Sequence, residues 1–394
     1  MQELMMQPET AQNTQIDWPS KRVEAFRFTP LNDRGLDALI PARAAAQAPA
    51  FDAGLADAIQ LNFVAGKLMS DMAEQAFSLN RLSDDKTAKD MLHSLLPADH
   101  PSAQSADVGA GWVLDIAAGI EIEQPILFSF TGGALDEVAS PVIVIRLGAG
   151  AKATIAEAHS TDLGLNAPVM FYDIAADAKL DHAKWQAEGK TTTHLGLSLF
   201  QLAEKADMAS LTLSMGAKLA RCESHVLLAG EEVKIALHNL YLGKDRQHLD
   251  TTTRLHHAVP NCCSDQVIRG VLDDSATGVF QGQIRVAPDA QKTDGQQMSR
   301  ALLLSRDAEV HTKPELEIFA DDVVCSHGAT VGELDERQLF YLMARGIDRD
   351  TARALLIEAF LIEALDEIRA PALSAWLNKP VAAWLGKSDG EEAA

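Results

Sequence analysis

The sequence predicts a mainly β protein whose central part is a β-solenoid between two helical ends. Up to about residue 100, apolar residues return at spacings of three and four, as in Leu55–Met69. Beyond that point they alternate, as in Pro141–Leu147, and the helical spacing returns after Thr330. With 394 residues, of which 47% are hydrophobic, the chain is long enough for two or three domains. We expect an N-terminal helical domain over 1–105, a parallel β-helix core over 106–330 and a C-terminal helical domain over 331–394.

A short step of small residues recurs in the strand region with a period near 27. Its central positions are residues 151, 178, 206 and 233. Such a period without helices between the strands is typical of solenoid coils. The alternative is a sandwich or barrel, whose turns would come about every 8 to 12 residues without a longer repeat. The repeat favours the solenoid. Its four copies are Gly150-Ala-Lys152, Asp177-Ala-Lys179, Lys205-Ala-Asp207 and Glu232-Val-Lys234.

Two helices are expected after the strand region. Asp335 with Gln338 resembles a capping box, and Gly346 stands where the C-cap of that first helix is expected. A second helix should begin after Asp348 and continue to Leu365. Its apolar residues cover more than a narrow stripe, so it should bury more than one side. Either one side meets the solenoid and another a partner chain, or the tail only caps the solenoid.

Composition excludes several classes of function. The 34 basic and 56 acidic residues give a net charge of -22, which argues against nucleic acid and anionic membrane surfaces as partners. No apolar window approaches 18 residues, and Met1–Gln15 lacks the pattern of a targeting segment, so we expect a cytoplasmic protein. The cysteines are too few and too irregular for a disulfide framework, and reduced thiols are expected. They are Cys222, Cys262, Cys263 and Cys325.

Cys325 and His327 are the candidate metal ligands. If Pro314–Thr330 is one extended strand, residues of equal parity share a face, and both donors lie on the polar face with Glu315 and Glu317. Strand rise then places the two donors roughly 6 to 7 Å apart, as for neighbouring atoms of a cluster. A tetrahedral metal or an iron-sulfur cluster takes about four donors, so two are missing. The plainer interpretation, a buried thiol beside a satisfied imidazole, stays open.

Other donor-rich segments point less clearly to chemistry. Arg254–Ser264 holds two imidazoles and two thiols, but neighbouring residues of a strand face opposite sides and the spacing does not suit zinc. We therefore expect a structural role. Acidic pairs such as Asp273 with Asp274 leave a solenoid hydrolase or lyase as a competing function. Only 5% of the residues are aromatic, which is few for a sugar-binding surface.

Two segments resemble the end of a phosphate-binding loop. They are Gly189-Lys-Thr191 and Gly386-Lys-Ser388. Lys184 and Val381 stand where the first glycine of that motif is required. We expect no nucleotide site in this chain.

Several long motifs resemble the SufB/SufD family of iron-sulfur cluster assembly scaffolds. The likeness spans most of the chain and is densest from residue 265 to 350. Gly328 favours the SufD branch, because SufB-like chains carry Glu after the histidine. The motifs are Trp18–Thr29, Val271–Gly282, Ala290–Asp294, Leu302–Ser305, Pro314–Thr330, Leu339–Leu342 and Arg345–Ile347.

The resemblance implies a right-handed parallel β-helix and a complex with SufB and two copies of the SufC ATPase. SufB and SufD would pair through their β-helices, and a transient iron-sulfur cluster or iron would be held at their interface. His327, with Cys325 beside it, becomes the ligand from this subunit, and SufB supplies the missing donors. The C-terminal helices would dock SufC, to which ATP hydrolysis belongs, so the chain is expected to be a non-catalytic scaffold.

Two further possibilities stay open beside that scheme. The isolated chain could form a homodimer, and a purely structural partner subunit would carry Cys325 and His327 incidentally. The chain also departs from the family at Glu333, where a basic or neutral residue is frequent, and at Gly295, where Ala is common. Its N-terminal helical region is short. None of these departures touches Cys325 or His327.

Overall fold

The computed structural model describes residues 16–43, 53–70, 76–97, 100–106 and 108–386. The expectation for Met1–Gln15 lies outside the described residues. So do residues 387–388 of Gly386-Lys-Ser388, the second segment that resembles a phosphate-binding loop. None of the helices in these ranges has both the length and the apolar character needed to span a membrane.

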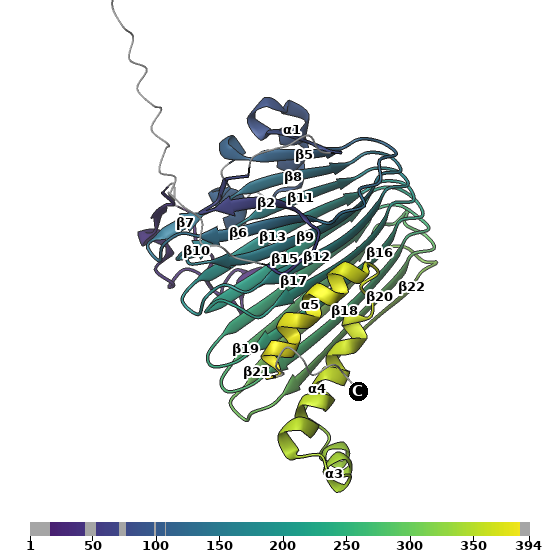
Figure 1. The fold of residues 1–394 in the computed structure, drawn as a ribbon. Helices are drawn as coiled ribbons and strands as arrows, with labels where there is room; N and C mark the ends of the chain where they lie inside the picture. Colours follow the sequence, from purple (N-terminus) through teal and green to yellow (C-terminus); the bar gives the residue numbers. More distant parts are fainter. Residues whose placement is uncertain (1–15, 44–52, 71–75, 98–99, 107, 387–394) are drawn as a thin grey trace, which may run out of the picture.

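The predicted fold class is confirmed, because the core is a parallel β-solenoid of about eight turns (Figure 1). Along the core the chain passes alternately between two sheets, and each strand pairs in parallel with the strand two places on. In sheet order, the ten-stranded sheet contains β22 (Val324–Gly332), β20 (Asp294–Leu303), β18 (Cys263–Leu272), β16 (Lys234–Gly243), β14 (Asp207–Ser214), β12 (Lys179–Gln186), β9 (Lys152–Thr161), β6 (Ile126–Gly132), β2 (Ile59–Val64) and β3 (Lys67–Leu68).

The twelve-stranded sheet faces the first across the core. Its main path is joined by three short strands at one side. The path contains β21 (Glu309–Ile318), β19 (Thr277–Val286), β17 (His248–His257), β15 (Leu219–Leu228), β13 (Thr193–Leu202), β11 (Val169–Ile174), β8 (Val142–Leu147), β5 (Trp112–Ile116) and β4 (Ser78–Arg81), and the short strands are β1 (Ile40–Pro41), β7 (Glu137–Ala139) and β10 (Leu165–Asn166).

The 27-residue repeat marks one corner of each coil. Gly150, Asp177, Lys205 and Glu232 all have a left-handed backbone, with φ between 56° and 68°. Each turn is tied to the next, since Asp177 donates its backbone N–H to Glu204 over 2.9 Å. A left-handed residue other than glycine costs about 1 to 2 kcal/mol, and stacking in register offsets that cost. The repeat read from the sequence is therefore a stack of equivalent turns.

The helix expected over Leu55–Met69 is wrong. Residues Ile59–Val64 form β2, which pairs in parallel with β6, and the chain then reverses into β3. Leu61 and Phe63 are buried in the core. The alternation of Ile59, Leu61 and Phe63 fits a strand as well as the helical spacing does, and pairing with a strand 67 residues later along the chain decided between them.

The remaining N-terminal segments close the first coils of the solenoid. They include α1 (Lys86–Leu95) and α2 (Pro101–Ser105), and the 3-10 turns Glu24–Phe26, Leu36–Ala38, Leu82–Asp84 and Val108–Ala110. Leu92 of α1 and Leu82 pack on apolar residues of β5 and β8. Two antiparallel strands, β3 and β4, end the two sheets at this side. The described part of residues 1–105 is thus a mixed cap with strands as well as helices.

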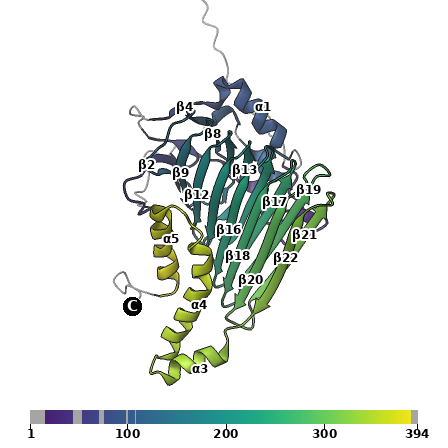
Figure 2. The ribbon, with the colours of Figure 1, turned by 90° about the vertical axis from the view of Figure 1, so that its right-hand side faces the viewer.

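Three helices follow the solenoid: α3 (Glu336–Ala344), α4 (Arg349–Leu365) and α5 (Pro371–Trp384). Asp335 caps α3 by accepting the backbone N–H of Arg337 over 2.8 Å, and Asp348 caps α4 by accepting that of Thr351 over 3.0 Å. Helices α4 and α5 lie along the outer face of the ten-stranded sheet, where Trp376 is buried (Figure 2). Helix α3 extends beyond the sheet (Figures 1 and 2).

Candidate functional site

Cys325 and His327 lie on β22, the last strand of the ten-stranded sheet. β22 pairs with β20 along one edge, with Cys325 opposite Gly295 and His327 opposite Gln297. Within the described residues no strand pairs with its other edge. The same holds for β21 in the facing sheet. The final coil is therefore open, while the first coils are closed by the N-terminal segments.

The single strand expected over Pro314–Thr330 is wrong, and with it the shared polar face. The chain leaves one sheet after Ile318 and enters the other at Val324, so Glu315 and Glu317 belong to a different sheet from the two donors. The Cys325 side chain packs against the apolar core of the solenoid. Polar and apolar residues happen to keep alternating through the turn between β21 and β22. Alternation assigns residues to a face only within one strand, so it does not carry over from β21 to β22.

The two donors differ in their surroundings. Cys325 is half-buried, and its Sγ would lie 3.3 Å from a Cβ placed on Gly295. The expectation that no departure from the family touches Cys325 is therefore wrong, because Gly295 lies directly opposite it on β20. Burial raises the pKa of the Cys325 thiol; the backbone N–H of Gly295 opposes that shift and Asp294 adds to it. The thiol is therefore protonated at neutral pH, and it becomes a metal ligand only when a cation replaces its proton. His327 is exposed.

Gly328 does not serve the close approach of another backbone. A Cβ at this position would lie 2.9 Å from Cε of Met298, so the glycine makes room for that side chain. Around the open coil lie four exposed apolar residues: Ile318, Phe319, Val324 and Val331. Glu315 and Glu317 of β21 have polar partners, with Lys313 Nζ 3.1 Å from Glu315 and Gln283 donating to Glu317 over 3.0 Å. The open coil thus presents exposed apolar residues beside the two candidate metal ligands.

The cluster Arg254–Ser264 does not converge on a metal. Cys262 is buried, whereas Cys263, the first residue of β18, is exposed, so the two thiols face different surroundings. His257 is buried and its Nε2 lies 2.8 Å from Ser264 Oγ. These contacts fit the structural role expected from the spacing.

A group of three donors that the sequence did not indicate lies inside the solenoid. One ligand atom each of His159, Glu188 and His194 lies within 4.8 Å of the others, and all three residues are buried. It is the only such group of three or more among the described residues. The one signal in the sequence was polar residues at alternate positions of apolar strands, as in Glu157 with His159.

Opposite charges hold this interior group together. Although burial opposes charge, the Glu188 carboxylate raises the pKa of His194 to about 9, and His194 lowers the pKa of Glu188 to about 2. Burial and the nearby Lys184 ammonium lower the pKa of His159 to about 4. At neutral pH His194 is therefore charged and His159 is neutral.

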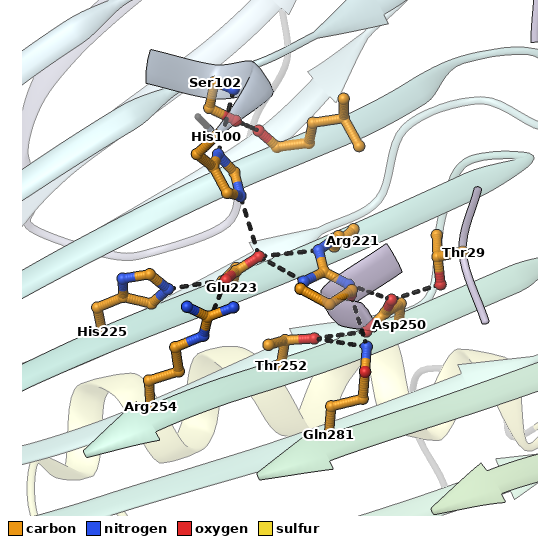
Figure 3. Close-up of polar contacts among 12 residues, drawn as sticks. Thr29, His100, Ser102, Arg221, Glu223, His225, Asp250, Thr252, Arg254 and Gln281 are labelled. Atoms are coloured by element: carbon orange, nitrogen blue, oxygen red, sulfur yellow. Dashed lines mark hydrogen bonds and ion pairs between the residues drawn. The ribbon is translucent and has the colours of Figure 1, made fainter. Parts of the chain in front are cut away.

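A second buried network attaches the N-terminal segment to the outer face of the twelve-stranded sheet (Figure 3). Arg221 lies between two carboxylates, with Nη2 2.6 Å from Glu223 and Nη1 2.6 Å from Asp250. Glu223 also contacts His100 of the N-terminal cap at 3.1 Å, and Asp250 accepts the hydroxyl of Thr29. Burial opposes ionisation here, yet Arg221 holds the pKa of Glu223 well below its usual range. The segment that resembles a family motif at Trp18–Thr29 is thereby fixed to the core.

Comparison with known proteins places this architecture among cluster assembly proteins. The family model described as "SUF system FeS cluster assembly, SufBD core domain" matches residues 130–360. The chain is 37% identical over 233 residues to the iron-sulfur cluster assembly protein SufD of Escherichia coli, covering 58% of this chain and 55% of that protein.

Two further relatives come from photosynthetic organisms. The chloroplastic protein ABCI7 of Arabidopsis thaliana is 31% identical over 267 residues, covering 65% of this chain and 56% of that protein. A SufBD family protein of Synechocystis is 32% identical over 285 residues, covering 68% of this chain and 62% of that protein. The chain thus spans a little over half the length of the relatives it matches.

Proposed function

The chain belongs to the SufBD family of the SUF iron-sulfur cluster assembly system, and from this premise we propose that it is a SufD-like scaffold subunit. In this proposal it pairs with a SufB paralogue, and its C-terminal helices bind the SufC ATPase. A nascent iron-sulfur cluster, or iron on its way to one, is the cargo at the interface. The chain contributes metal ligands and holds the cargo in place, and ATP hydrolysis takes place on SufC.

The open final coil is the observation that carries this proposal. A solenoid end with unpaired edge strands and exposed apolar side chains is a surface that a partner covers. Val324 donates its backbone N–H to Thr293 over 2.9 Å, toward β20. Because N–H groups alternate sides along a strand, those of Cys325, His327 and Ala329 point to the free edge. A partner strand added there would lie directly beside both donors.

The donor chemistry suits a shared and transient site. Thiolate is the soft ligand that iron-sulfur chemistry favours, and imidazole ligation raises the reduction potential of a cluster. Two donors from this chain leave about two positions for a partner. The raised pKa of Cys325 keeps the thiol protonated until a metal arrives, which limits its oxidation beforehand.

Helix α3 supports the proposed ATPase contact. Its side chains Phe340, Tyr341 and Met343 are exposed although they are apolar or aromatic, and Phe340 is 73% exposed. Arg345 fixes Tyr341 by donating to its hydroxyl over 2.7 Å. An apolar helix face that projects from the solenoid is the type of surface used for a protein partner. We propose residues 331–394 as the ATPase-docking domain.

Replacing Ala329 with proline tests pairing through the free edge. Ala329→Pro removes one edge-directed N–H and leaves the ladder to β20 intact, because the residue's N–H points away from β20. We expect affinity for the SufB partner to fall by roughly tenfold, the worth of one lost hydrogen bond plus the steric effect of the ring. Isothermal titration calorimetry with the purified partner measures it.

Ala329→Val is the matched control, because it keeps the N–H and favours a strand. Its affinity should stay within about twofold of the parent. Equal binding by Ala329→Pro and the parent would show that the partner does not extend this sheet. Sedimentation of the chain alone tests the homodimer: self-association that Ala329→Pro also weakens would mean that a second copy uses the same edge.

Replacing Phe340 with aspartate tests the ATPase contact. A charge in the centre of an apolar patch should weaken SufC binding by about 2 kcal/mol or more, roughly thirtyfold, if Phe340 is an anchor residue. Leu135→Asp, at an exposed apolar residue before β7, is the control and should bind as the parent does. Undiminished binding of Phe340→Asp in a pull-down titration would place the ATPase elsewhere.

A further inference from the structure

Three buried donors from neighbouring coils converge inside the solenoid. His159 lies on β9, Glu188 follows β12, and His194 is near the start of β13. Two imidazoles and one carboxylate form the donor set with which proteins hold Zn²⁺ and non-haem Fe²⁺. We propose that these three side chains form a binding site for a divalent transition-metal ion, separate from the donors of the open coil.

The orientation of His159 is that of a metal ligand. Its Nε2 lies 2.9 Å from Glu157 Oε2, so the ring donates that N–H to the carboxylate and has its lone pair on Nδ1, which accepts a long hydrogen bond from Asn166. Asn166 Nδ2 lies 3.4 Å from this Nδ1 and 2.9 Å from Glu188 Oε1, so Nδ1 faces the Glu188 side. Glu157 is itself fixed by the Tyr172 hydroxyl at 2.7 Å. Such a carboxylate behind a histidine sets the tautomer and ring angle in metal sites.

Glu188 and His194 supply the other two donors. His194 Nδ1 and Glu188 Oε1 are 2.7 Å apart with a proton between them, and the second oxygen, Oε2, accepts from Gln186 over 2.5 Å. A tetrahedral ion with bonds of about 2.0 to 2.1 Å requires ligand atoms about 3.3 Å apart. The three atoms lie within 4.8 Å of one another, so small side-chain rotations bring them to that spacing. The proton between Nδ1 and Oε1 leaves to solvent when the ion enters.

The charges around the group suit an ion that displaces a proton. At neutral pH the carboxylates of Glu157 and Glu188 are balanced by the Lys184 ammonium, 3.9 Å from Glu157, and by the charged His194 ring, 2.7 Å from Glu188. When an ion displaces the proton of His194, two carboxylates face a single ammonium, and they compensate the charge of the ion.

This site is independent of the proposed partners. β12 and β22 are five positions apart in the sheet order, so the interior donors are far along the solenoid from Cys325 and His327. Because the donors are buried, the ion enters as the chain folds rather than by diffusion into the finished coil. Binding to the isolated full-length chain is thus the direct test, and it can fail or succeed whatever becomes of the SufB pairing.

The test uses Co²⁺ and the full-length double variant Cys325→Ser/His327→Ala, which removes the donors of the open coil. After refolding with Co²⁺ and desalting, we expect one ion per chain by elemental analysis, with visible Co²⁺ absorption and no thiolate charge-transfer band. Adding His159→Gln or His194→Gln should abolish the bound ion. Adding Glu157→Gln, which keeps all three proposed ligands but removes the carboxylate behind His159, should weaken binding by roughly tenfold to a hundredfold.

His238→Gln in the same background is the matched control. His238 is a buried histidine with an unpartnered Nε2 on β16, outside the donor group, and this variant should keep one ion per chain. Less than stoichiometric Co²⁺ in the double variant would overturn the proposal, as would equal Co²⁺ in the His194→Gln protein or a thiolate band. If a glutamine variant fails to refold, the stoichiometry and spectrum of the double variant decide alone.

Discussion

His327→Ala is expected to fold and to pair with its partners, but to lose cluster loading. The side chain is exposed on an edge strand, so its removal leaves no cavity and no unpaired buried group. Changing a residue that only orients a metal ligand already costs tenfold to a hundredfold in metal affinity, and the loss of the ligand itself should cost at least as much. Iron and acid-labile sulfide, measured anaerobically in the complex reconstituted with SufB and SufC, should fall by roughly tenfold or more.

His93→Ala is the matched control for this experiment. His93 is also exposed, but it lies on α1 at the closed end of the solenoid. The control should load as the parent does. Cys325→Ser should also reduce loading, because it removes the thiolate beside the imidazole. If the His327→Ala complex loads iron and sulfide like the parent, His327 is not a cargo ligand and the proposed site is wrong.

Arg221→Met is expected to lower the free energy of unfolding by about 3 to 5 kcal/mol at neutral pH. The guanidinium is buried between Glu223 and Asp250, and although burial opposes its charge, these two carboxylates raise the pKa of Arg221. Without the guanidinium, the two buried carboxylates lie close together and their negative charge is only partly compensated by other groups. The loss should shrink toward low pH, where protonation removes that charge. Urea denaturation at several pH values measures it.

Arg349→Met is the matched control for the buried pair. Arg349 forms an ion pair with Glu336 at 3.3 Å, but both side chains are mostly exposed. Such surface pairs contribute about 0 to 1 kcal/mol. Hydrogen exchange should also show earlier opening around Thr29 in Arg221→Met, because this network holds the N-terminal segment (Figure 3). A loss below about 1 kcal/mol would mean that the two carboxylates find other partners.

Local patterns predicted the solenoid and its C-terminal helices. Asp177 and Lys205 mark turns that stack on one another, and a stack of equivalent coils repeats its sequence signal at the coil length. Asp335 and Asp348 cap helices because an N-cap is a contact between residues three or fewer apart. Both kinds of signal are complete within a short stretch of chain.

The errors arose where a non-local contact decided the outcome. Leu55–Met69 fits both periods, and parallel pairing of β2 with β6 made it a strand followed by a turn. Cys325 and Glu317 were assigned to the same face of one strand, but a turn separates their two strands. The sequence of that turn contains no glycine or proline to mark it. His159 and His194 lie 35 residues apart, and only the stacking of coils brings them together.

The sequence by itself determined that coils stack and where helices begin after the core, and it singled out Cys325 and His327 as candidate donors. Tertiary structure alone decided that these two residues lie on an edge strand of the final coil that no strand of the described residues covers, and that a separate His159–Glu188–His194 group lies inside. The physical reason is how far apart in the sequence the contacting residues lie. Turns and caps depend on neighbouring residues, whereas an open edge or a buried group of donors depends on which strands lie beside one another.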